Sequence, residues 1–477
     1  MIGKRQSLRL CGLTTGLLGL FVGSAALAAT ITVNSLADPG QPGICALRDA
    51  ITAVNTKTAT NGCPAGSGND TINVLPRITG TISLVSTLPD VTDSQLTING
   101  SSSPGITIMG SLPVGRVLEV AAGATLSLNN LSIAHGFSLI KVDAAATLNL
   151  NHISITNGFA ISDGAGIDNA GTLTVSDSVI SYNEADGPGG GIFNDGALTV
   201  TRSTFSGNGG DGGGAIVNDV GATLTVSDST FTGNSSLHGG AGALSNDGTL
   251  TVINSTFFGN RCAHSCTGGI FNYGVLTVTN GTFSNNMGAT GGIFNFSGSA
   301  SLKSTILASS TFQPPPVGLP STNCHGAITD AGFNISDDSS CGFAKTGSAN
   351  NGDRVDPLLS TAGLANNGGP TQTIALQSGS PAIDAIPVAD CKDQASPPNP
   401  ITTDQRGLLR PDNGEQLCDI GAYEFQDFAG ETGQANCFDD SVRTLTGQFG
   451  SFDAAASALG YPSVRALQNA ISAFCKG

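Results

Sequence analysis

Short runs of alternating apolar and polar residues recur along the middle of the chain at nearly constant distances. One leucine of each run stands 22 to 26 residues from the next, at Leu126, Leu148, Leu173, Leu198, Leu224, Leu250 and Leu276. A second apolar column follows seven residues after each leucine, at Ile133, Ile155, Ile180, Phe205, Phe231, Phe257 and Phe283. Alternation predicts short strands, and the Gly, Asn, Asp and Ser residues between the runs predict turns.

A constant period of this length predicts a repeat architecture in which each unit packs only on its neighbours. No window has the spacing and length of a repeat helix, which excludes helical repeats. Three short strands per unit predict an all-β fold, a right-handed parallel β-helix with the Leu, Ile and Phe columns pointing inward. Asn amides both donate and accept, so we expect a hydrogen-bonded Asn ladder at one turn, formed by Asn183, Asn208, Asn234, Asn260 and Asn286.

The regions outside the repeats have different patterns, so the chain divides into five parts. The first has a basic start, an apolar run and a small-residue exit, which predicts a secretory signal peptide. The parts are a signal peptide (1–29), an N-terminal cap (30–69), β-helix repeats (70–310), irregular β coils that complete the rod (311–425) and a disulfide-closed helical tail (426–477).

Helical spacing is confined to the two ends. Near the N-terminus, Leu47, Ala50, Ile51 and Val54 share one helical face, and a helix there would protect the first coil from strand addition. In the tail, residues 451–459 and 463–474 are expected to form two short helices. The tail is either a plain C-terminal cap or a docking or anchoring module.

The chain is acidic and carries a formal net charge of −16 at pH 7. Recognition of DNA or RNA phosphates requires a basic face, so nucleic acid is not an expected partner. After residue 29 no segment approaches 18 consecutive apolar residues, and no transmembrane helix is predicted.

The ten cysteines after the predicted signal peptide form five neighbouring couples. An exported protein meets an oxidising compartment, so we expect local disulfides, which would join Cys45 to Cys63, Cys262 to Cys266, Cys324 to Cys341, Cys391 to Cys418 and Cys437 to Cys475. Zinc is an alternative at Cys262 and Cys266, but no second Cys/His pair nearby completes a set of four ligands.

One charged column carries the only candidate catalytic group. Asp177, Arg202 and Asp228 each stand four residues after a column leucine, so Arg202 is expected between two aspartates, with a backbone spacing of about 4.8 Å. In an enzyme of polysaccharide-lyase type, carboxylates and a basic residue would form a catalytic patch. The favoured interpretation is a structural charge ladder, because the same column continues as Asn.

Three further aspartates, Asp195, Asp219 and Asp247, each follow the turn Asn of a coil. They could bind Ca²⁺, but the repeat lacks the calcium-binding nonapeptide G-G-x-G-x-D, so a role in the turns is the simpler interpretation. No other metal and no cofactor is predicted.

Several short motifs, taken in order, resemble known families. The phrases GGGIFN (189–194), GGAIVN (213–218) and STFTGN (229–234) resemble the GGA-I and Phe-x-x-Asn repeats of polymorphic outer-membrane proteins. The segment CALRDAI (45–51) resembles the CSLREA motif, with Ala in place of Ser and Asp in place of Glu. DQRGLLRP (404–411) and CDIGAYEF (418–425) are similar to the choice-of-anchor Q family.

This resemblance implies a β-helical protein that is secreted or displayed on the surface of a Gram-negative bacterium, often with an adhesive role. Within the matched C-terminal motifs, a buried ion network is expected to close the rod, with a ligand pocket as the alternative. Its members would be Asp404, Arg406, Arg410, Asp419 and Glu424.

We therefore expect a non-enzymatic protein that binds a polysaccharide or another cell-surface component. The first alternative is a carbohydrate-active enzyme of polysaccharide-lyase type, with Asp177, Arg202 and Asp228 as its candidate residues. The second is a passive structural protein of the envelope or matrix. Fold analogy alone does not decide among the three.

Overall fold

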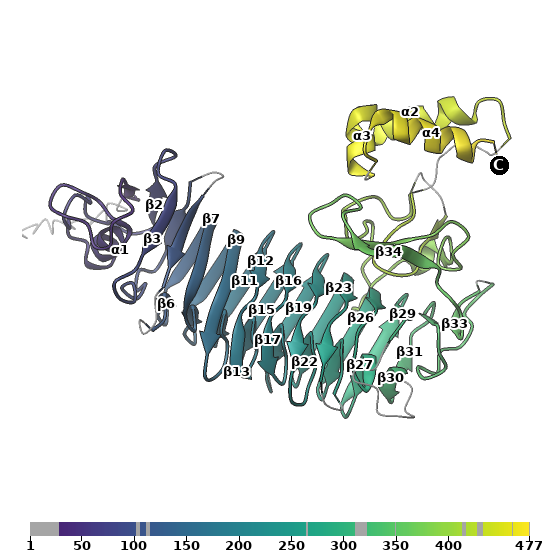
Figure 1. The fold of residues 1–477 in the computed structure, drawn as a ribbon, viewed down its shortest axis with the longest axis horizontal. Helices are drawn as coiled ribbons and strands as arrows, with labels where there is room; N and C mark the ends of the chain where they lie inside the picture. Colours follow the sequence, from purple (N-terminus) through teal and green to yellow (C-terminus); the bar gives the residue numbers. More distant parts are fainter. Residues whose placement is uncertain are drawn as a thin grey trace, which may run out of the picture.

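The computed structural model describes residues 28–101, 105–110, 115–263, 266–310, 322–348, 350–412, 416–426, 433–459 and 461–476. The predicted signal peptide lies outside the described residues, apart from its last two positions. Parallel strands stack into a β-helix of about ten coils, which confirms the predicted fold class (Figure 1). Within the described ranges, no helix is long and apolar enough to cross a membrane.

Each coil contributes strands to two sheets. The larger sheet has 24 strands and bends, so that it has two faces, here called the first and the second limb, and a short third edge. The first limb contains β1 (Thr30–Val33), β2 (Asp70–Val74), β4 (Leu96–Asn99), β7 (Thr125–Phe137), β9 (Thr147–Ala160), β11 (Thr172–Ser176), β15 (Ala197–Thr201), β19 (Thr223–Ser227), β23 (Thr249–Phe258), β26 (Val275–Ser284), β28 (Ser299–Lys303) and β31 (Thr329–Asp330). The second limb contains the ends of β7, β9, β23 and β26, together with β3 (Gly80–Ser83), β5 (Ile106–Met109), β12 (Val179–Ser181), β16 (Thr204–Ser206), β20 (Thr230–Thr232), β29 (Ile306–Ala308), β32 (Ile335–Ser336) and β33 (Gly352–Asp353). The third edge contains β13 (Glu184–Pro188), β17 (Gly209–Asp211), β21 (Ser235–Ser236) and β24 (Arg261–Cys262).

The second sheet has nine strands and forms the opposite face of the rod. Its strands are β6 (Leu118–Val120), β8 (Ile140–Val142), β10 (Ile167–Asn169), β14 (Ile192–Asn194), β18 (Ile216–Asn218), β22 (Leu244–Asn246), β25 (Ile270–Asn272), β27 (Thr290–Asn295) and β30 (Thr322–Gly326).

The apolar columns of the sequence become rows of the core. Leu224 pairs in register with Leu198 and Leu250, and its side chain is buried. The phenylalanine column stacks ring on ring, with centroid distances of 4.9, 4.9 and 4.5 Å between successive rings from Phe205 to Phe283. Alternation along each strand thus places one continuous apolar core inside the rod.

Polar ladders run beside this core. In the predicted ladder, each Asn from Asn183 to Asn260 donates its amide Nδ2 to the Oδ1 of the next Asn, at 2.9 to 3.0 Å. A second ladder from Asn169 to Asn295 has Nδ2–Oδ1 distances of 2.7 to 2.8 Å. A column of serines was not predicted from the sequence. Ser203 Oγ accepts from the backbone N–H of Ser178 at 3.1 Å, and neighbouring coils repeat this hydrogen bond. The ladders satisfy buried polar groups at the turns.

The N-terminal end of the rod is closed as the sequence predicted. Helix α1 (Leu47–Thr56) buries Leu47, Ala50, Ile51 and Val54 against the first coil. The disulfide between Cys45 and Cys63 holds the loops that flank this helix.

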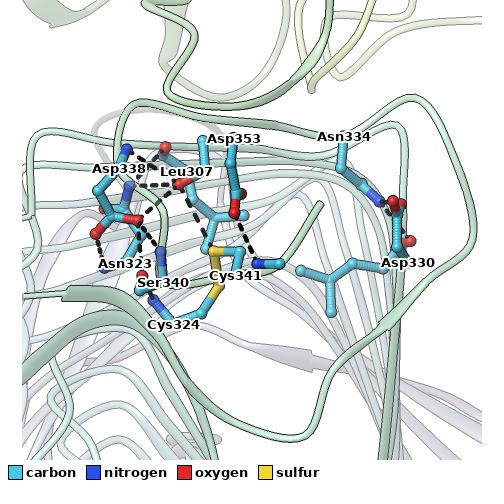
Figure 2. The surroundings of a disulfide bond; sticks show 12 residues. Leu307, Asn323, Cys324, Asp330, Asn334, Asp338, Ser340, Cys341 and Asp353 are labelled. Atoms are coloured by element: carbon cyan, nitrogen blue, oxygen red, sulfur yellow. Dashed lines mark hydrogen bonds between the residues drawn. A yellow bond between two sulfur atoms is a disulfide. The ribbon is translucent and has the colours of Figure 1, made fainter. Parts of the chain in front are cut away.

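At the other end, a short loop covers the last strand of the nine-stranded sheet (Figure 2). The backbone N–H of Asn323 in β30 donates to Oδ2 of Asp338 at 2.8 Å, and that of Cys324 donates to Oγ of Ser340 at 2.9 Å. The disulfide between Cys324 and Cys341 ties the loop to the strand. Side-chain acceptors thus occupy groups with which another strand could pair.

The structure differs from the expectation that residues 311–425 complete the rod. Only β30 to β33 add to the stack, whereas the described residues of 359–425, here called the return segment, lie outside it, on the second limb and on the last strands of the first. The return segment contains the antiparallel pair β34 (Leu359–Ala365) and β35 (Thr373–Leu376), the pair β36 (Ile386–Pro387) and β37 (Leu417–Cys418), and the 3-10 helix η1 (Val388–Asp390). The reason is that this segment has no repeating column, so nothing holds it in register with the coils.

The tail contains three helices rather than the two expected: α2 (Cys437–Phe449), α3 (Phe452–Ala458) and α4 (Val464–Phe474). Helix α2 was missed although Phe438, Val442, Leu445 and Phe449 have helical spacing and pack in the tail's own small core. A disulfide joins Cys437, at the start of α2, to Cys475, at the end of α4.

Candidate functional site

The charged column of the sequence lies at the corner between the two limbs of the large sheet. Its members have positive φ, including 49° at Asp177, 46° at Arg202 and 51° at Asp228. Asn and Asp tolerate this left-handed conformation better than most residues, which explains why the column is rich in them.

Arg202 pairs with only one of its two expected partners. Its Nε and Nη2 donate to the two carboxylate oxygens of Asp177, at 2.8 and 2.7 Å. Asp228 instead accepts from the side chain of Asn254 at 3.3 Å. Burial, and to a smaller extent the nearby charge of Asp404, raise the pKa of Asp228 to about 6. The expected ladder with Arg202 between two aspartates is thus half formed.

These three residues do not share the shallow hollow beside Asp177. Asp177 lines a shallow hollow of about 340 Å³ with His152, whereas Arg202 and Asp228 do not line it. The return segment covers Asp228, because Thr371 donates its hydroxyl to the backbone carbonyl of that aspartate at 3.0 Å. The geometry therefore supports a structural role for the column.

All five predicted disulfides are present, joining the expected couples. Because Cys262 and Cys266 are joined to each other, neither thiolate is available for the zinc alternative. Within the described residues, no three His, Cys, Asp or Glu side chains are grouped so that they could hold a metal ion.

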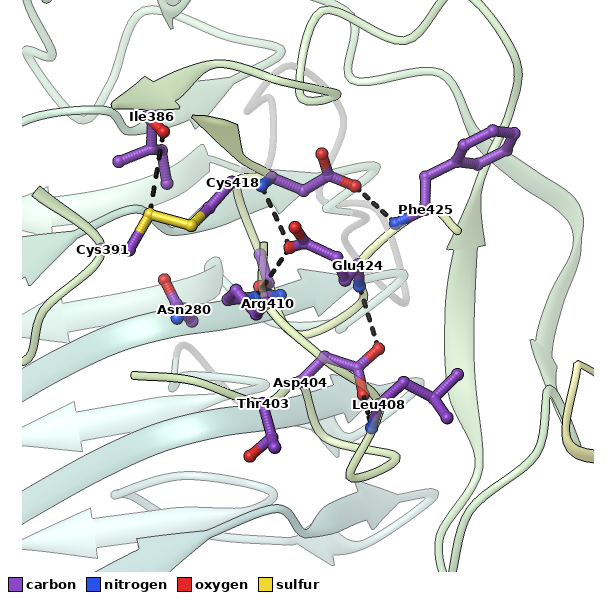
Figure 3. A network of polar contacts seen from close by, with 12 residues as sticks. Asn280, Ile386, Cys391, Thr403, Asp404, Leu408, Arg410, Cys418, Glu424 and Phe425 are labelled. Carbon is purple, nitrogen blue, oxygen red and sulfur yellow. Dashed lines mark hydrogen bonds and ion pairs between the residues drawn. A yellow bond between two sulfur atoms is a disulfide. The ribbon is translucent and has the colours of Figure 1, made fainter. Parts of the chain in front are cut away.

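The expected C-terminal ion network is formed and buried within the return segment (Figure 3). Arg410 Nε lies 2.8 Å from a carboxylate oxygen of Glu424, and Arg406 Nη2 lies 2.7 Å from one of Asp404. Asp419 accepts from the backbone N–H of Asp384 at 2.8 Å. Burial raises the pKa of Glu424 to about 7 despite Arg410, and burial together with the charge of Glu424 raises that of Asp419.

Gln405 joins this network to the rod. Its Nε2 donates to the hydroxyl oxygens of Thr230 and Thr371, at 2.8 and 2.9 Å. Its Oε1 accepts from the hydroxyl of Thr256 at 2.6 Å. The residues that resemble the choice-of-anchor Q motif therefore fasten the return segment to the second limb.

A hollow with a volume of about 590 Å³ lies on the outer face of the nine-stranded sheet. We call it the aromatic groove. Its floor consists of residues that pair in register on five successive strands, Phe193, Val217, Ser245, Phe271 and Phe294. It is also lined by residues that precede the strands, among them Gly212, Gly239 and Cys266, and by residues that follow them.

Four aromatic side chains cluster at one end of the aromatic groove, from two neighbouring coils. Strand register pairs Phe271 with Phe294, and their ring centroids are 5.0 Å apart. Tyr273 and Phe296 follow these strands, with centroids 4.9 Å apart. Tyr273 is 44% exposed and Phe296 is 59% exposed, so this aromatic quartet presents free ring surface to solvent.

Two carboxylates continue the row of Tyr273 and Phe296 along the groove. Register makes Asp219, Asp247, Tyr273 and Phe296 neighbours on four successive coils. Burial, and then the charge of Asp219, raise the pKa of Asp247. The third aspartate of this column, Asp195, is exposed and does not line the groove.

The aspartates were predicted from the sequence as turn residues, whereas the aromatic quartet was not predicted. The signal was present in IFNY (270–273) and IFNF (293–296), where aromatic residues two positions apart must point to the same side of a strand. No protein-family model, curated protein or solved structure matches the chain.

Proposed function

We propose that this protein is an exported or cell-surface rod that binds a glycan chain in its aromatic groove without converting it chemically. The observation that carries the proposal is the aromatic quartet, with Tyr273 and Phe296 exposed to solvent, next to two carboxylates in one hollow. Aromatic surface with a few placed polar groups is typical of ligand sites, and sugar rings offer an apolar C–H face that can stack on such rings.

The shape of the site supports a chain ligand. The groove follows the rod axis across five coils, each displaced by about 4.8 Å from the last. Five disulfides fit an oxidising compartment such as the cell exterior. The resemblance of the repeats to polymorphic outer-membrane proteins supports a surface location and an adhesive role.

The test is retention of the purified protein on a panel of immobilised neutral, amino and acidic glycans. We expect retention on some of them, and at least a tenfold loss of affinity in the double variant Tyr273→Ala/Phe296→Ala. A matched control is Tyr182→Ala, which removes an exposed aromatic ring outside the groove and should bind as the unmodified protein does.

The same preparation separates the alternatives. Release of new sugar ends or unsaturated products, abolished by replacing Arg202, would establish the enzyme of lyase type and contradict binding alone. Absence of retention on every glycan would contradict the proposal and favour a passive structural rod.

A further inference from the structure

The electrostatics of the aromatic groove restrict the class of glycan, an inference that rests on the proposed function. Asp219 and Asp247 line the groove on neighbouring coils, and neither has an ion-pair partner among the described residues. None of the described lining residues is Lys, Arg or His. Elsewhere on the same sheet face, by contrast, Glu119 pairs with both Arg116 and Lys141.

The two carboxylates also repel each other. The charge of Asp219 raises the pKa of Asp247, after burial, and likewise that of Asp163 in a neighbouring loop. A ligand that brings a positive charge between these side chains would relieve the repulsion, whereas a uronic acid would add a like charge.

The aromatic quartet strengthens the same preference. Aromatic ring faces attract cations through the negative charge density above and below the ring. Tyr273 follows Asp247 by one coil, so a ring stacked on Tyr273 would place a substituent within reach of the Asp247 carboxylate. Stacking surface and unpaired carboxylates therefore lie side by side.

We propose that the aromatic groove selects glycans that carry free amino groups, such as de-N-acetylated amino-sugar chains, over their N-acetylated and acidic counterparts. The aromatic quartet stacks the sugar rings, and Asp219 and Asp247 pair with the protonated amines. A lysine-rich peptide offers the same charge but lacks flat C–H ring faces, so it should not depend on the quartet.

The experiment measures the affinity of the full chain for chitosan oligosaccharides and for N-acetylated oligosaccharides of the same length, at mildly acidic pH, where the sugar amines are protonated, and in low and high salt. We expect about tenfold tighter binding of the amino form, about 1.4 kcal/mol, and loss of this preference at high salt because ions screen exposed charges. In Asp219→Asn/Asp247→Asn the preference should disappear, while affinity for the N-acetylated chain is retained.

The matched control is Glu184→Gln/Asp186→Asn, which removes two exposed carboxylates that line a different hollow and should keep the preference. Equal affinity for both forms in the unmodified protein would overturn this inference and leave the proposed function standing. Failure to bind any glycan would overturn both. Equally tight binding of a lysine-rich peptide, unaffected by Tyr273→Ala/Phe296→Ala, would overturn the assignment to glycans.

Discussion

The outward faces of the second limb and of the nine-stranded sheet differ in composition. The first is covered by the return segment, whereas the second is open to solvent. On the second limb, Thr230, Thr256 and Thr282 point outward and are buried by the return segment. On the nine-stranded sheet, Tyr273 and Phe296 point outward and remain open. The covered face is hydroxyl-rich, whereas the open face is aromatic.

The hydrophobic effect alone would favour the reverse arrangement, because covering aromatic surface releases more free energy than covering threonine. The polar face is covered through side-chain hydrogen bonds and a buried ion network, which specify one docking geometry. An exposed apolar cluster kept next to a hollow is a feature of interaction sites. The comparison therefore points to the nine-stranded sheet as the face that meets a partner.

The largest expected effect comes from breaking the ion network of the covered face. Arg410→Ala leaves Glu424 buried without its partner, which should lower the free energy of unfolding by about 3–5 kcal/mol. Denaturation in urea followed by circular dichroism measures the loss. The double variant Arg410→Met/Glu424→Gln, which removes both charges, should lose less, and a loss below 1 kcal/mol in Arg410→Ala would contradict the assigned role.

A smaller loss is expected when the covered face is loosened at Gln405. In Gln405→Ala the hydroxyls of Thr230, Thr256 and Thr371 lose a partner, at a cost of about 1–3 kcal/mol. Hydrogen exchange should also accelerate in β35. The control Gln426→Ala, at a half-buried residue whose side-chain hydrogen bond to the Leu409 carbonyl lies at the surface, should stay within about 0.5 kcal/mol of the unmodified protein. Unchanged exchange in β35 would show that other contacts hold the segment.

The rod itself was predictable from the sequence, because each coil contacts only its neighbours. A constant spacing therefore translates directly into register, as with Leu198, Leu224 and Leu250. The same locality made the disulfides predictable, since the joined cysteines are between 4 and 38 residues apart.

The return segment and the aromatic groove were not predictable for two different reasons. Thr230 and Gln405 are 175 residues apart and belong to no shared repeat, so no repeating column of residues predicts their contact. The groove depends on outward residues, which the core does not constrain, and on loops of unequal length before each strand. Only the segments IFNY (270–273) and IFNF (293–296), which lie on neighbouring coils, indicate that these two coils differ from the rest.

Asp228, at the border of the covered face, should make the free energy of unfolding depend on pH. Burial raises its pKa to about 6 in the folded protein, against about 3.9 when unfolded. The folded state therefore binds the proton more tightly, and the stability contributed by this group, present below pH ~4, is lost as the pH rises to ~6. Asp228→Asn should stabilise the protein by about 1–2 kcal/mol at neutral pH and remove this slope. The corner accepts Asn, as Asn254 shows in the next coil. Parallel pH profiles for the two proteins would contradict the assignment.

The smallest effect is expected at Arg202, at the uncovered corner between the two limbs. Its ion pair with Asp177 is partly exposed, so a double-mutant cycle with Arg202→Asn and Asp177→Asn should give a coupling energy below about 1 kcal/mol. Asn suits the positive φ at both positions, which keeps backbone strain out of the comparison. The coupling should shrink further in high salt, and glycan retention should be unchanged in all three variants. A coupling of several kcal/mol, or loss of retention with intact folding, would move the binding site from the nine-stranded sheet to this corner.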